Sequence, residues 1–515
     1  MRNFEPLPVV AVVGGGFSGA AVALHLARSE RPEGRVVVFE PRARLGAGLA
    51  YDTAEPTNRI NVPAGKMSLY PDEPASFLAY LERADALAGD PGAVSADGGA
   101  YPRRSVFGDY VASELVPYLS SGAIEHRRAQ VLGIRRSAGQ WTIATSDGQE
   151  LVADIVVIAV SHPAPALPKA LLPVLSHAKL VADPTKAGAF EVIAPADRVF
   201  IVGNGLTSAD VVAALDQRGH HGPIISISRR GLRSRGHPAV AQDPYGDFVS
   251  EPISRASELL RRIRQVLHAA RQQGLDWHPV LDAVRAQGQQ IWRALPVVER
   301  RRIARLARPY WDAHRFRIAP QVEEVLDRAV ESGRLNVLAA SIASAAIEGQ
   351  EIVVDLKERG QGAWRRIAVD VIVVTTGPAH GGILRSQPFL SALEEAGALT
   401  PCETGLGIAC DLHARAVGAS GLADPSLLIA GPLARGTFGE LMGLPQVTEH
   451  AAFVAREVEA LLGRLRHQRQ PERLGGDRIK RAFAYSPEGE DNLREDVLFG
   501  KIFLSKTIDY NMIST

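Results

Sequence analysis

Short aliphatic runs separated by glycine turns and alanine-rich stretches dominate the start of this chain. Val9–Val13 is entirely aliphatic, and Val36–Phe39 is a second such run, which ends at Glu40. Between them lies Ala20–Arg28, whose alanine-rich composition favours a helix. Continuous aliphatic runs of this length are typical of parallel strands that are buried on both faces. The pattern therefore predicts a strand, a glycine turn, a helix and a second strand.

The same order of patterns recurs in the middle of the chain. Val199–Val202 and Ile224–Ile227 are predicted strands, and Ala209–Gln217 between them is predicted to be helical. Two further aliphatic runs, Ile155–Val160 and Val371–Val374, are each preceded by Asp and are expected to be central strands. Strands that alternate with helices indicate the α/β class with parallel sheets. We therefore expect two Rossmann-like dinucleotide-binding domains.

The hydrophobic spacing changes to a helical period between about residues 252 and 334. One apolar stripe at this period consists of Leu259, Leu260, Ile263, Val266, Leu267 and Ala270. Arginines occupy the other side of the same stretch, as expected for an amphipathic helix. The second domain is therefore predicted to carry a helical insertion.

These patterns divide the chain into four parts. Residues 1–185 are expected to form the first part of one dinucleotide-binding domain, and residues 186–350 a second dinucleotide-binding domain with its helical insertion at 252–334. Residues 351–465 are expected to return to the first domain. Residues 466–515 follow a polar linker and form a C-terminal tail to which the sequence assigns no role.

Composition and charge exclude several classes of protein. The chain has 515 residues with 58 basic and 57 acidic side chains, which argues against a nucleic-acid-binding protein. Cys402 and Cys410 lack CxxC spacing, so no dithiol centre and no disulfide framework is expected, and the cytoplasm is the expected compartment. The apolar stretch Pro6–Ala27 is interrupted by glycines, so a strand, turn and helix explain it better than a membrane span. No metal site is expected, because His220-His221 is an isolated pair.

The first glycine turn carries a dinucleotide-binding motif. Gly14, Gly16 and Gly19 follow a strand and open a helix, and Glu40 closes the next strand. This context predicts a turn that brings backbone N–H groups, including those of Phe17 and Ser18, close to a pyrophosphate. Glu40 can accept hydrogen bonds from both ribose hydroxyls, which favours FAD or NAD over a nucleotide with a 2′-phosphate.

The second glycine turn differs at two points. Gly203 and Gly205 are present, but Ser208 stands where a third glycine is expected. Arg229 and Arg230, rather than an acid, follow the next strand. A guanidinium there can hold a 2′-phosphate, which favours NADPH over NADH. A solvated basic turn beside an NADH site, or a vestigial site, remains the alternative.

Four strings of residues resemble one known family. They are Gly46–Tyr51, Asn61–Leu69, Ser228–Leu232 and Gly431–Thr437. The chain from about Val9 to Leu462 resembles the FAD/NAD(P)-binding flavoprotein family that includes FAD-dependent urate hydroxylases and aspartate N-monooxygenases.

The resemblance implies an FAD domain followed by an NADPH domain. It implies an NADPH-dependent FAD monooxygenase that uses O2 to hydroxylate a small nitrogen-containing substrate, urate-like or an amino-acid amine. Asn61 would lie at the flavin edge, Gly431 would lie near the flavin chain, and a helix from about Gln446 would point its positive end at the ring. An NAD(P)H-dependent flavin reductase or oxidase without oxygen insertion is the alternative, and no catalytic residue is assigned.

The sequence departs from relatives of this kind in two places. Gly431-Pro432 stands where many of them have Gly-Asp, and the FxGxxxHxxxW motif of N-hydroxylating and Baeyer–Villiger relatives is matched only at His177. The string Tyr310–Arg317 in the insertion has two interpretations. It binds an anionic or nitrogen-rich substrate, or it is a packing and ion-pair cluster at a helix end.

Overall fold

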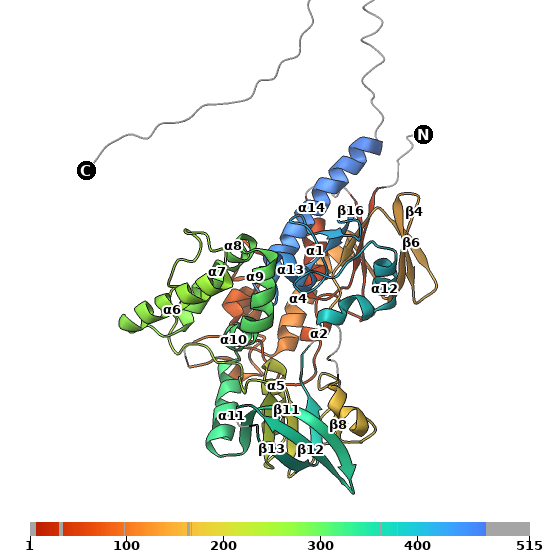
Figure 1. Ribbon diagram of the computed structural model, residues 1–515. Helices are drawn as coiled ribbons and strands as arrows, with labels where there is room; N and C mark the ends of the chain where they lie inside the picture. Colours follow the sequence, from red (N-terminus) through yellow and green to blue (C-terminus); the bar gives the residue numbers. More distant parts are fainter. Residues whose placement is uncertain are drawn as a thin grey trace, which may run out of the picture. The chain divides into compact units, whose positions relative to one another are not determined.

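The computed structural model describes residues 7–29, 34–96, 98–161, 165, 167–360, 362–377 and 380–469. The predicted C-terminal tail, apart from its first residues in the last helix, lies outside the described residues. Residues up to Arg466 form one compact unit, and the fold below is that of this unit (Figure 1).

The first sheet contains the predicted strands at the start of the chain. Its strands across the sheet are β15 (Arg415–Val417), β16 (Ala423–Ile429), β7 (Ile155–Ile158), β1 (Val9–Val13), β2 (Arg35–Phe39) and β3 (Ile124–Arg127). All pairs are parallel except β15 with β16. A separate antiparallel sheet contains β4 (Val131–Ser137), β5 (Gln140–Thr145) and β6 (Glu150–Ala153). The aliphatic runs form the centre of the first sheet because their side chains are buried on both faces.

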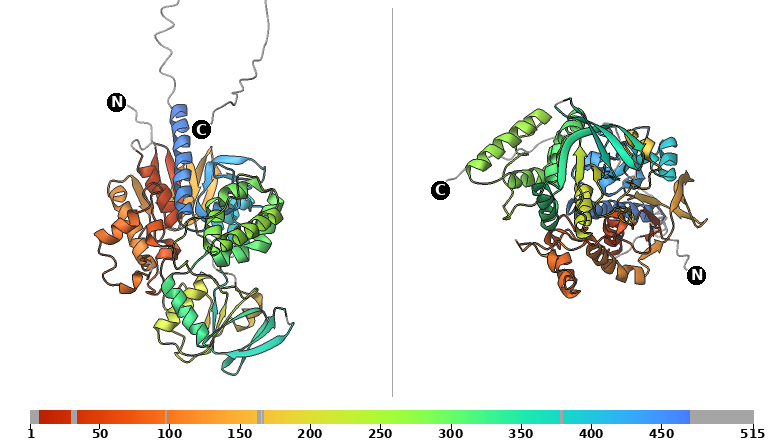
Figure 2. Two further views of the ribbon diagram at one scale, coloured as in Figure 1. Left: turned by 90° about the vertical axis from the view of Figure 1, so that its left-hand side faces the viewer. Right: turned by 90° about the horizontal axis from the view of Figure 1, so that it is seen from below.

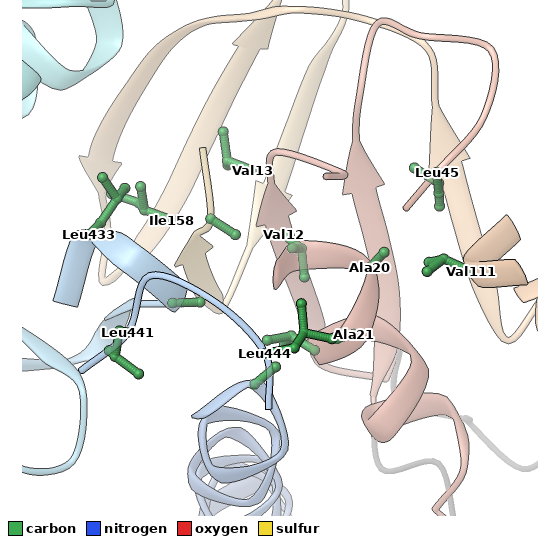
Figure 3. Close-up of a cluster of buried hydrophobic side chains, with 14 of the residues drawn as sticks. Val12, Val13, Ala20, Ala21, Leu45, Val111, Ile158, Leu433, Leu441 and Leu444 are labelled. Carbon is green, nitrogen blue, oxygen red and sulfur yellow. The ribbon is translucent and has the colours of Figure 1, made fainter. Parts of the chain in front are cut away.

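The first domain contains helices from both ends of the chain. They are α1 (Phe17–Ala27), α2 (Gly48–Tyr51), α3 (Ser76–Arg83), α4 (Arg104–Ser120), α12 (Pro388–Glu395), α13 (Arg435–Phe438) and α14 (Gln446–Arg469). Figure 3 shows Leu433 beside Ile158 of β7 and Leu444 beside Ala21 of α1, all of them buried. The first domain is therefore completed by a segment far along the chain.

The second sheet has seven strands. Their order is β13 (Trp364–Val369), β12 (Glu351–Glu358), β11 (Leu335–Glu348), β10 (Ile224–Ser228), β9 (Val199–Val202), β14 (Val371–Val374) and β8 (Leu180–Val181). Helices α5 (Leu206–Gln217) and α11 (Pro320–Glu331) pack together beside it. The predicted α/β class with two Rossmann-like domains is confirmed.

The second sheet includes strands on both sides of the predicted limits at residues 185 and 350. β8 pairs with β14 before residue 186, and β12, β13 and β14 extend the sheet past residue 350. The reason is hydrogen bonding: β11 turns back into an antiparallel hairpin with β12, and β14 then returns as a parallel strand beside β9.

The insertion forms a helical body with its own small apolar core. Its helices are α6 (Ala256–Gln272), α7 (His278–Ala286), α8 (Gly288–Ala294), α9 (Val297–Arg302), a π-helical turn η4 (Ile303–Ala307) and α10 (Arg308–Arg315). Figure 2 shows these green helices as a group distinct from the strands of both sheets. Among the described residues, no helix combines the length and apolar character needed to cross a membrane.

Candidate functional site

The first glycine loop is shaped by two close contacts and one open position. Gly14 has a φ of +99°, and a Cβ there would lie 2.8 Å from the Ala159 carbonyl oxygen. A Cβ on Gly19 would collide with the Gly14 carbonyl oxygen. Gly16 is different, because its Cβ would meet only Gly48 at 3.5 Å, an ordinary contact. Packing inside the protein thus does not require glycine at position 16, whereas a pyrophosphate lying against this backbone does.

Glu40 is a buried carboxylate at the end of β2, and it braces the loop. Its Oε2 accepts a hydrogen bond from the Gly15 N–H at 3.1 Å. Its Oε1 accepts from the backbone N–H of Arg42 at 3.1 Å and from the Arg42 guanidinium at 3.0 Å. The sequence analysis missed Arg42, whose only signal is its position two residues after the acid. The carboxylate lies where the ribose-binding acid of a dinucleotide site lies.

Three predicted residues meet at the start of α1. Phe17 begins the helix, and its ring lies 5.7 Å from that of Phe107. A Cβ on Gly431, whose φ is +68°, would collide with the Ser18 hydroxyl, so these two residues are in close contact. The Gly431 N–H donates to Nδ1 of His450 at 3.2 Å. Burial lowers the pKa of His450 to about 3, so the ring is neutral and accepts at Nδ1.

Asn61 lies where the first domain meets the segment after β10. Its backbone carbonyl accepts a hydrogen bond from Nε2 of His237 at 2.9 Å. Burial lowers the pKa of His237 to about 4, which keeps that ring neutral at pH 7. The Asn61 side chain has no hydrogen bond to any other described residue, whereas the Asn58 amide donates to Thr53. Asn61 is thus the better placed of the two asparagines to contact a bound group.

The second glycine loop repeats the turn of the first. Gly203 has a φ of +123°, and a Cβ there would collide with the Thr375 carbonyl. A Cβ on Gly205 would meet no atom within 4 Å, so this backbone is also open to a ligand. Ser208 is buried, and its hydroxyl lies 3.4 Å from that of Ser226. The helix thus accommodates a serine where the first loop requires glycine.

Arg229 and Arg230 follow β10 and have different surroundings. Arg229 is exposed and has no hydrogen-bond or ion-pair partner among the described residues. The guanidinium of Arg230 lies 5.3 Å from the centre of the Tyr310 ring in α10, in a cation–π contact. Only Arg229 is therefore free to bind an anion without losing an existing contact.

A cluster of buried charges connects the insertion with the segment before α14. Arg315 Nη2 lies 2.8 Å from Glu440 Oε1, and Arg435 lies 3.8 Å from Asp312. Burial lowers the pKa values of Arg315 and Arg435 and raises that of Asp312. The string Tyr310–Arg317 does form an ion-pair cluster, as one of its two interpretations holds.

The same face of the insertion reaches the start of α14. Arg285 donates to the Leu444 carbonyl at 2.7 Å and to the Gln446 side chain at 2.9 Å. Arg317 forms a two-point ion pair with Asp282 at 2.8 and 3.1 Å. Among the described residues, the buried Nε atoms of Arg285, Arg315 and Arg317 have no hydrogen-bond partner. This face therefore retains donors that its described neighbours leave unsatisfied.

Ion pairs join the two domains beside the glycine loops. Arg104 on α4 forms a two-point pair with Asp210 on α5 at 2.9 and 3.0 Å. Arg218 donates to Glu55 at 2.7 Å. Burial raises the pKa of Asp210, and the Arg104 charge opposes that rise. Partly buried pairs of this geometry fix how the domains meet.

The two cysteines carry free thiols. Burial raises the pKa of the Cys410 thiol to about 12, so it stays protonated at neutral pH. Across the described part of the chain, His, Cys, Asp and Glu side chains form no group of three suited to a metal ion.

Comparison with known proteins gives a family match for part of the chain. Residues 11–163, which include the first glycine loop and Glu40, match a family model described as FAD-NAD(P)-binding. No curated protein sequence matches the chain significantly. The match identifies the first domain as the FAD/NAD(P)-binding part.

Several solved structures share the fold of nearly the whole chain. The reduced ornithine hydroxylase from Pseudomonas aeruginosa has a TM-score of 0.59 at 17% identity, over 89% of this chain and 100% of that one. The ornithine N-hydroxylase from Kutzneria sp. 744, solved with reduced FAD, NADP+ and L-ornithine, has 0.56 at 17% identity, over 90% and 100%. The L-lysine 6-monooxygenase from Pseudomonas syringae has 0.58 at 17% identity, over 89% and 99%. At these identities the likeness is one of fold.

Proposed function

We propose that this protein is an NADPH-dependent FAD monooxygenase that hydroxylates a small nitrogen-containing substrate. The observation that carries the proposal is the pair of glycine loops, each with one open glycine, Gly16 or Gly205. The strand beside the first loop ends in the acid Glu40, whereas the strand beside the second is followed by the free cation Arg229. An acid suits the ribose of FAD, and an arginine suits the 2′-phosphate of NADPH.

The residues of the first loop fit FAD. Backbone N–H groups from Gly16 to Ser18 at the start of α1 would hold the pyrophosphate. Gly431, whose N–H donates a hydrogen bond to His450, lies in close contact with Ser18 on the same side of the loop. The start of α14 presents the positive end of a 24-residue helix, which stabilises negative charge on a reduced ring. Bound FAD supplies the hydride acceptance and the activation of O2.

The charged face of the insertion fits an amino-acid-like or urate-like substrate. It combines the cations Arg285, Arg315 and Arg317 with the acids Asp312 and Glu440. Cations suit a carboxylate or another anionic group, and acids suit an amine. The solved proteins of similar fold, whose names give ornithine and lysine as substrates, support an amine as the group that is oxidised. Urate hydroxylation, which the resemblance also implies, remains within the same proposal.

The overall reaction balances with one substrate, one O2, NADPH and a proton. One oxygen atom enters the substrate and the other leaves as water, while NADPH supplies two electrons and becomes NADP+. Buried apolar side chains around Phe438 and Leu441 exclude water beside the start of α14. The protein's part is thus to hold and orient the substrate and the nucleotides and to shield the reaction from water. No side chain has to act as a nucleophile.

The test is a screen of amines, amino acids and urate that records NADPH loss, O2 uptake and peroxide release together. A true substrate is expected to speed NADPH oxidation and to lower the peroxide released per NADPH. Under isotopically heavy O2, the product is expected to gain one heavy oxygen atom.

The competing function is a flavin reductase or oxidase without oxygen insertion. It predicts that the heavy label appears only in water and peroxide, with the candidate substrate reduced or unchanged. The protonated Cys410 thiol disfavours a version that relays electrons through a cysteine pair. If every substrate in the screen leaves the peroxide yield unchanged, the competing function replaces the monooxygenase.

A further inference from the structure

A pocket of about 630 Å³ lies between the insertion, the end of β10 and the loop 404–406. This arginine pocket is lined by Arg229, Val298, Arg301, Arg302, Ala304, Arg305, Arg308, Thr404, Gly405 and Leu406. Half of these residues are arginines, and none is an acid. Its volume falls within the roughly 300–1,000 Å³ of small-molecule sites.

The arginines of the insertion share one side of a continuous helical segment. Arg301 lies in the last turn of α9, Arg305 lies in the π-helical turn η4, and Arg308 begins α10. Residues three or four apart in a helix face the same way, which explains why all of them line one pocket. π-helical turns are frequently found at functional sites. Helices α9 and α10 are labelled in Figure 1.

Two of the pocket arginines are not neutralised by the protein. Arg301, Arg302 and Arg308 have acidic partners at 3.5, 2.7 and 3.4 Å, respectively. Arg229 and Arg305 have no ion-pair or hydrogen-bond partner among the described residues. The pocket thus holds uncompensated positive charge contributed by both the second domain and the insertion. Such a pocket attracts an anion with at least two charges.

The position of Arg229 identifies the kind of anion. In a Rossmann unit, the residue after the second strand contacts the adenosine ribose, and an arginine there accommodates a 2′-phosphate. Arg229 follows β10, the second strand of the unit that begins with β9 and the Gly203–Ser208 loop. The pocket therefore opens where the 2′-phosphate of a dinucleotide bound to this unit would lie.

We infer that Arg305 of the insertion, together with Arg229, binds the 2′-phosphate of NADPH. This inference rests on the proposed NADPH-dependent function and assigns the insertion a part in selecting the nucleotide. Arg301, Arg302 and Arg308 raise the positive potential around the site, while their acidic partners hold them in place. Thr404 and Gly405 close the pocket from the first domain, so the bound phosphate contacts three separate segments of the chain.

The experiment measures binding of the 2′-phosphate group without turnover. Isothermal titration of the FAD-loaded protein compares adenosine 2′,5′-bisphosphate with 5′-AMP, which lacks the 2′-phosphate. Arg305→Ala is expected to weaken the affinity for the bisphosphate by about 10- to 100-fold and to change the affinity for 5′-AMP by no more than about twofold. Arg229→Ala, from the opposite wall of the pocket, is expected to give the same selective loss.

Arg264→Ala is the matched control, because Arg264 is an exposed arginine of the same insertion on α6, outside the pocket. It removes the same charge and is expected to change neither affinity. Equal losses in the Arg305 and Arg264 variants would show a general effect of net charge and would overturn the inference. Equal loss of 5′-AMP and bisphosphate in the Arg305 variant would also overturn it.

The affinity for inorganic pyrophosphate shows whether the pocket is a 2′-phosphate site or a general anion site. The inference expects pyrophosphate to bind at least about tenfold more weakly than the bisphosphate, because it lacks the adenosine that Gly205 and β10 would hold. Pyrophosphate binding as tight as the bisphosphate would overturn the assignment to a nucleotide.

Anaerobic reduction of the flavin by NADPH, seen as bleaching of the flavin, distinguishes failure of the inference from failure of the proposed function. If NADPH bleaches the unaltered protein but the Arg305 and Arg264 variants bind the bisphosphate alike, the inference fails and the proposed function stands. If neither NADPH nor NADH bleaches the unaltered protein, the proposed function fails, whatever the titrations show.

Discussion

The loop between β1 and α1 and the loop between β9 and α5 make the same turn but have different surroundings. In the first, the Glu40 carboxylate accepts a hydrogen bond from the loop, and Gly431 is in close contact with Ser18. The Gly431 N–H in turn donates a hydrogen bond to His450. The second has no such carboxylate after its neighbouring strand, which is followed instead by Arg229, a residue without a partner in the described part of the chain. One site is thus completed by the chain itself, whereas the other leaves positive charge for a ligand to neutralise. Under the proposed function, the same backbone geometry would serve two nucleotides of different charge.

The largest expected effect comes from substituting the open glycine of each loop, Gly16 in the first and Gly205 in the second. Gly16→Val is expected to lower flavin content by more than about tenfold, because the branched side chain occupies the space needed by the pyrophosphate. Both positions have negative φ angles that valine tolerates, so the effect arises from the ligand and not from strain. Flavin absorbance per protein after purification is the measurement.

Gly205→Val is the matched variant in the second loop. It is expected to keep the flavin and to slow its reduction by NADPH. Full flavin occupancy in the Gly16 variant, at normal yield, would show that the first loop does not hold FAD.

The next effect compares the third position of each motif. Gly19→Ala is expected to destabilise the protein by about 2–3 kcal/mol, because its Cβ would collide with the Gly14 carbonyl. Ser208→Ala removes one weak contact between hydroxyls and is expected to cost less than about 1 kcal/mol. Thermal unfolding with saturating FAD measures both. Equal shifts of the unfolding temperature in the two variants would mean that the two helices approach their loops equally closely.

Acid is expected to destabilise the first site more than the second. The pKa of His450 is about 3 in the folded protein, whereas an unfolded histidine titrates near its ordinary value of 6.5. The unfolded chain thus takes up the proton first, so this stability is complete above pH 6.5 and is lost as the pH falls towards 3. Between pH 6.5 and 5 the expected loss is about 2 kcal/mol.

Unfolding experiments across this pH range measure the loss. His450→Gln, which keeps an acceptor for the Gly431 N–H, is expected to flatten the pH dependence. His220→Gln, beside the second sheet, is the comparison. The pKa of His220 is also lowered by burial, but its hydrogen bond with the Asp197 carbonyl opposes that shift, so its replacement is expected to flatten the curve less. A curve unchanged by His450→Gln would contradict the prediction.

The last expected effect distinguishes the two arginines after β10. Arg229→Ala is expected to raise the KM for NADPH about tenfold, or about 1.4 kcal/mol, and to leave that for NADH nearly unchanged. Arg230→Ala is expected to affect both nucleotides alike, because this side chain packs on Tyr310. Steady-state kinetics with each nucleotide decide between them. An equal rise for both nucleotides in the Arg229 variant would indicate a structural role instead.

The buried strands were predictable because each is an uninterrupted aliphatic run. Val9–Val13, Val199–Val202 and Val371–Val374 have the predicted bounds. Helices α1 and α5 begin earlier than predicted, at Phe17 and Leu206, because the preceding glycine is the N-cap and the chain turns directly into the helix. The alanine-rich pattern marks the helix centre but carries no signal for that first turn.

The extent of the second sheet and the charge cluster were not predictable from local patterns. The long strand β11 mixes buried and exposed residues without regular alternation, so its hairpin with β12 gave no clear period. The pair Arg315–Glu440 and the contact of Gly431 with His450 join residues whose neighbours in sequence do not indicate a partner. The functional assignments of the glycine loops, Asn61, Arg229 and Arg230 stay predictions until the variants are measured.

The late strand β16 has a consequence for how the protein is made. β16 pairs with β7 at the heart of the first sheet, and Gly431, α13 and α14 come after it in the chain. During synthesis, β1, β2, β3 and β7 leave the ribosome long before their last parallel neighbour does. The second sheet and the insertion are thus both translated while the first sheet still exposes an unpaired edge on β7. Nascent chains halted before residue 423 are therefore expected to depend on chaperones and to take up flavin only after release of the finished chain.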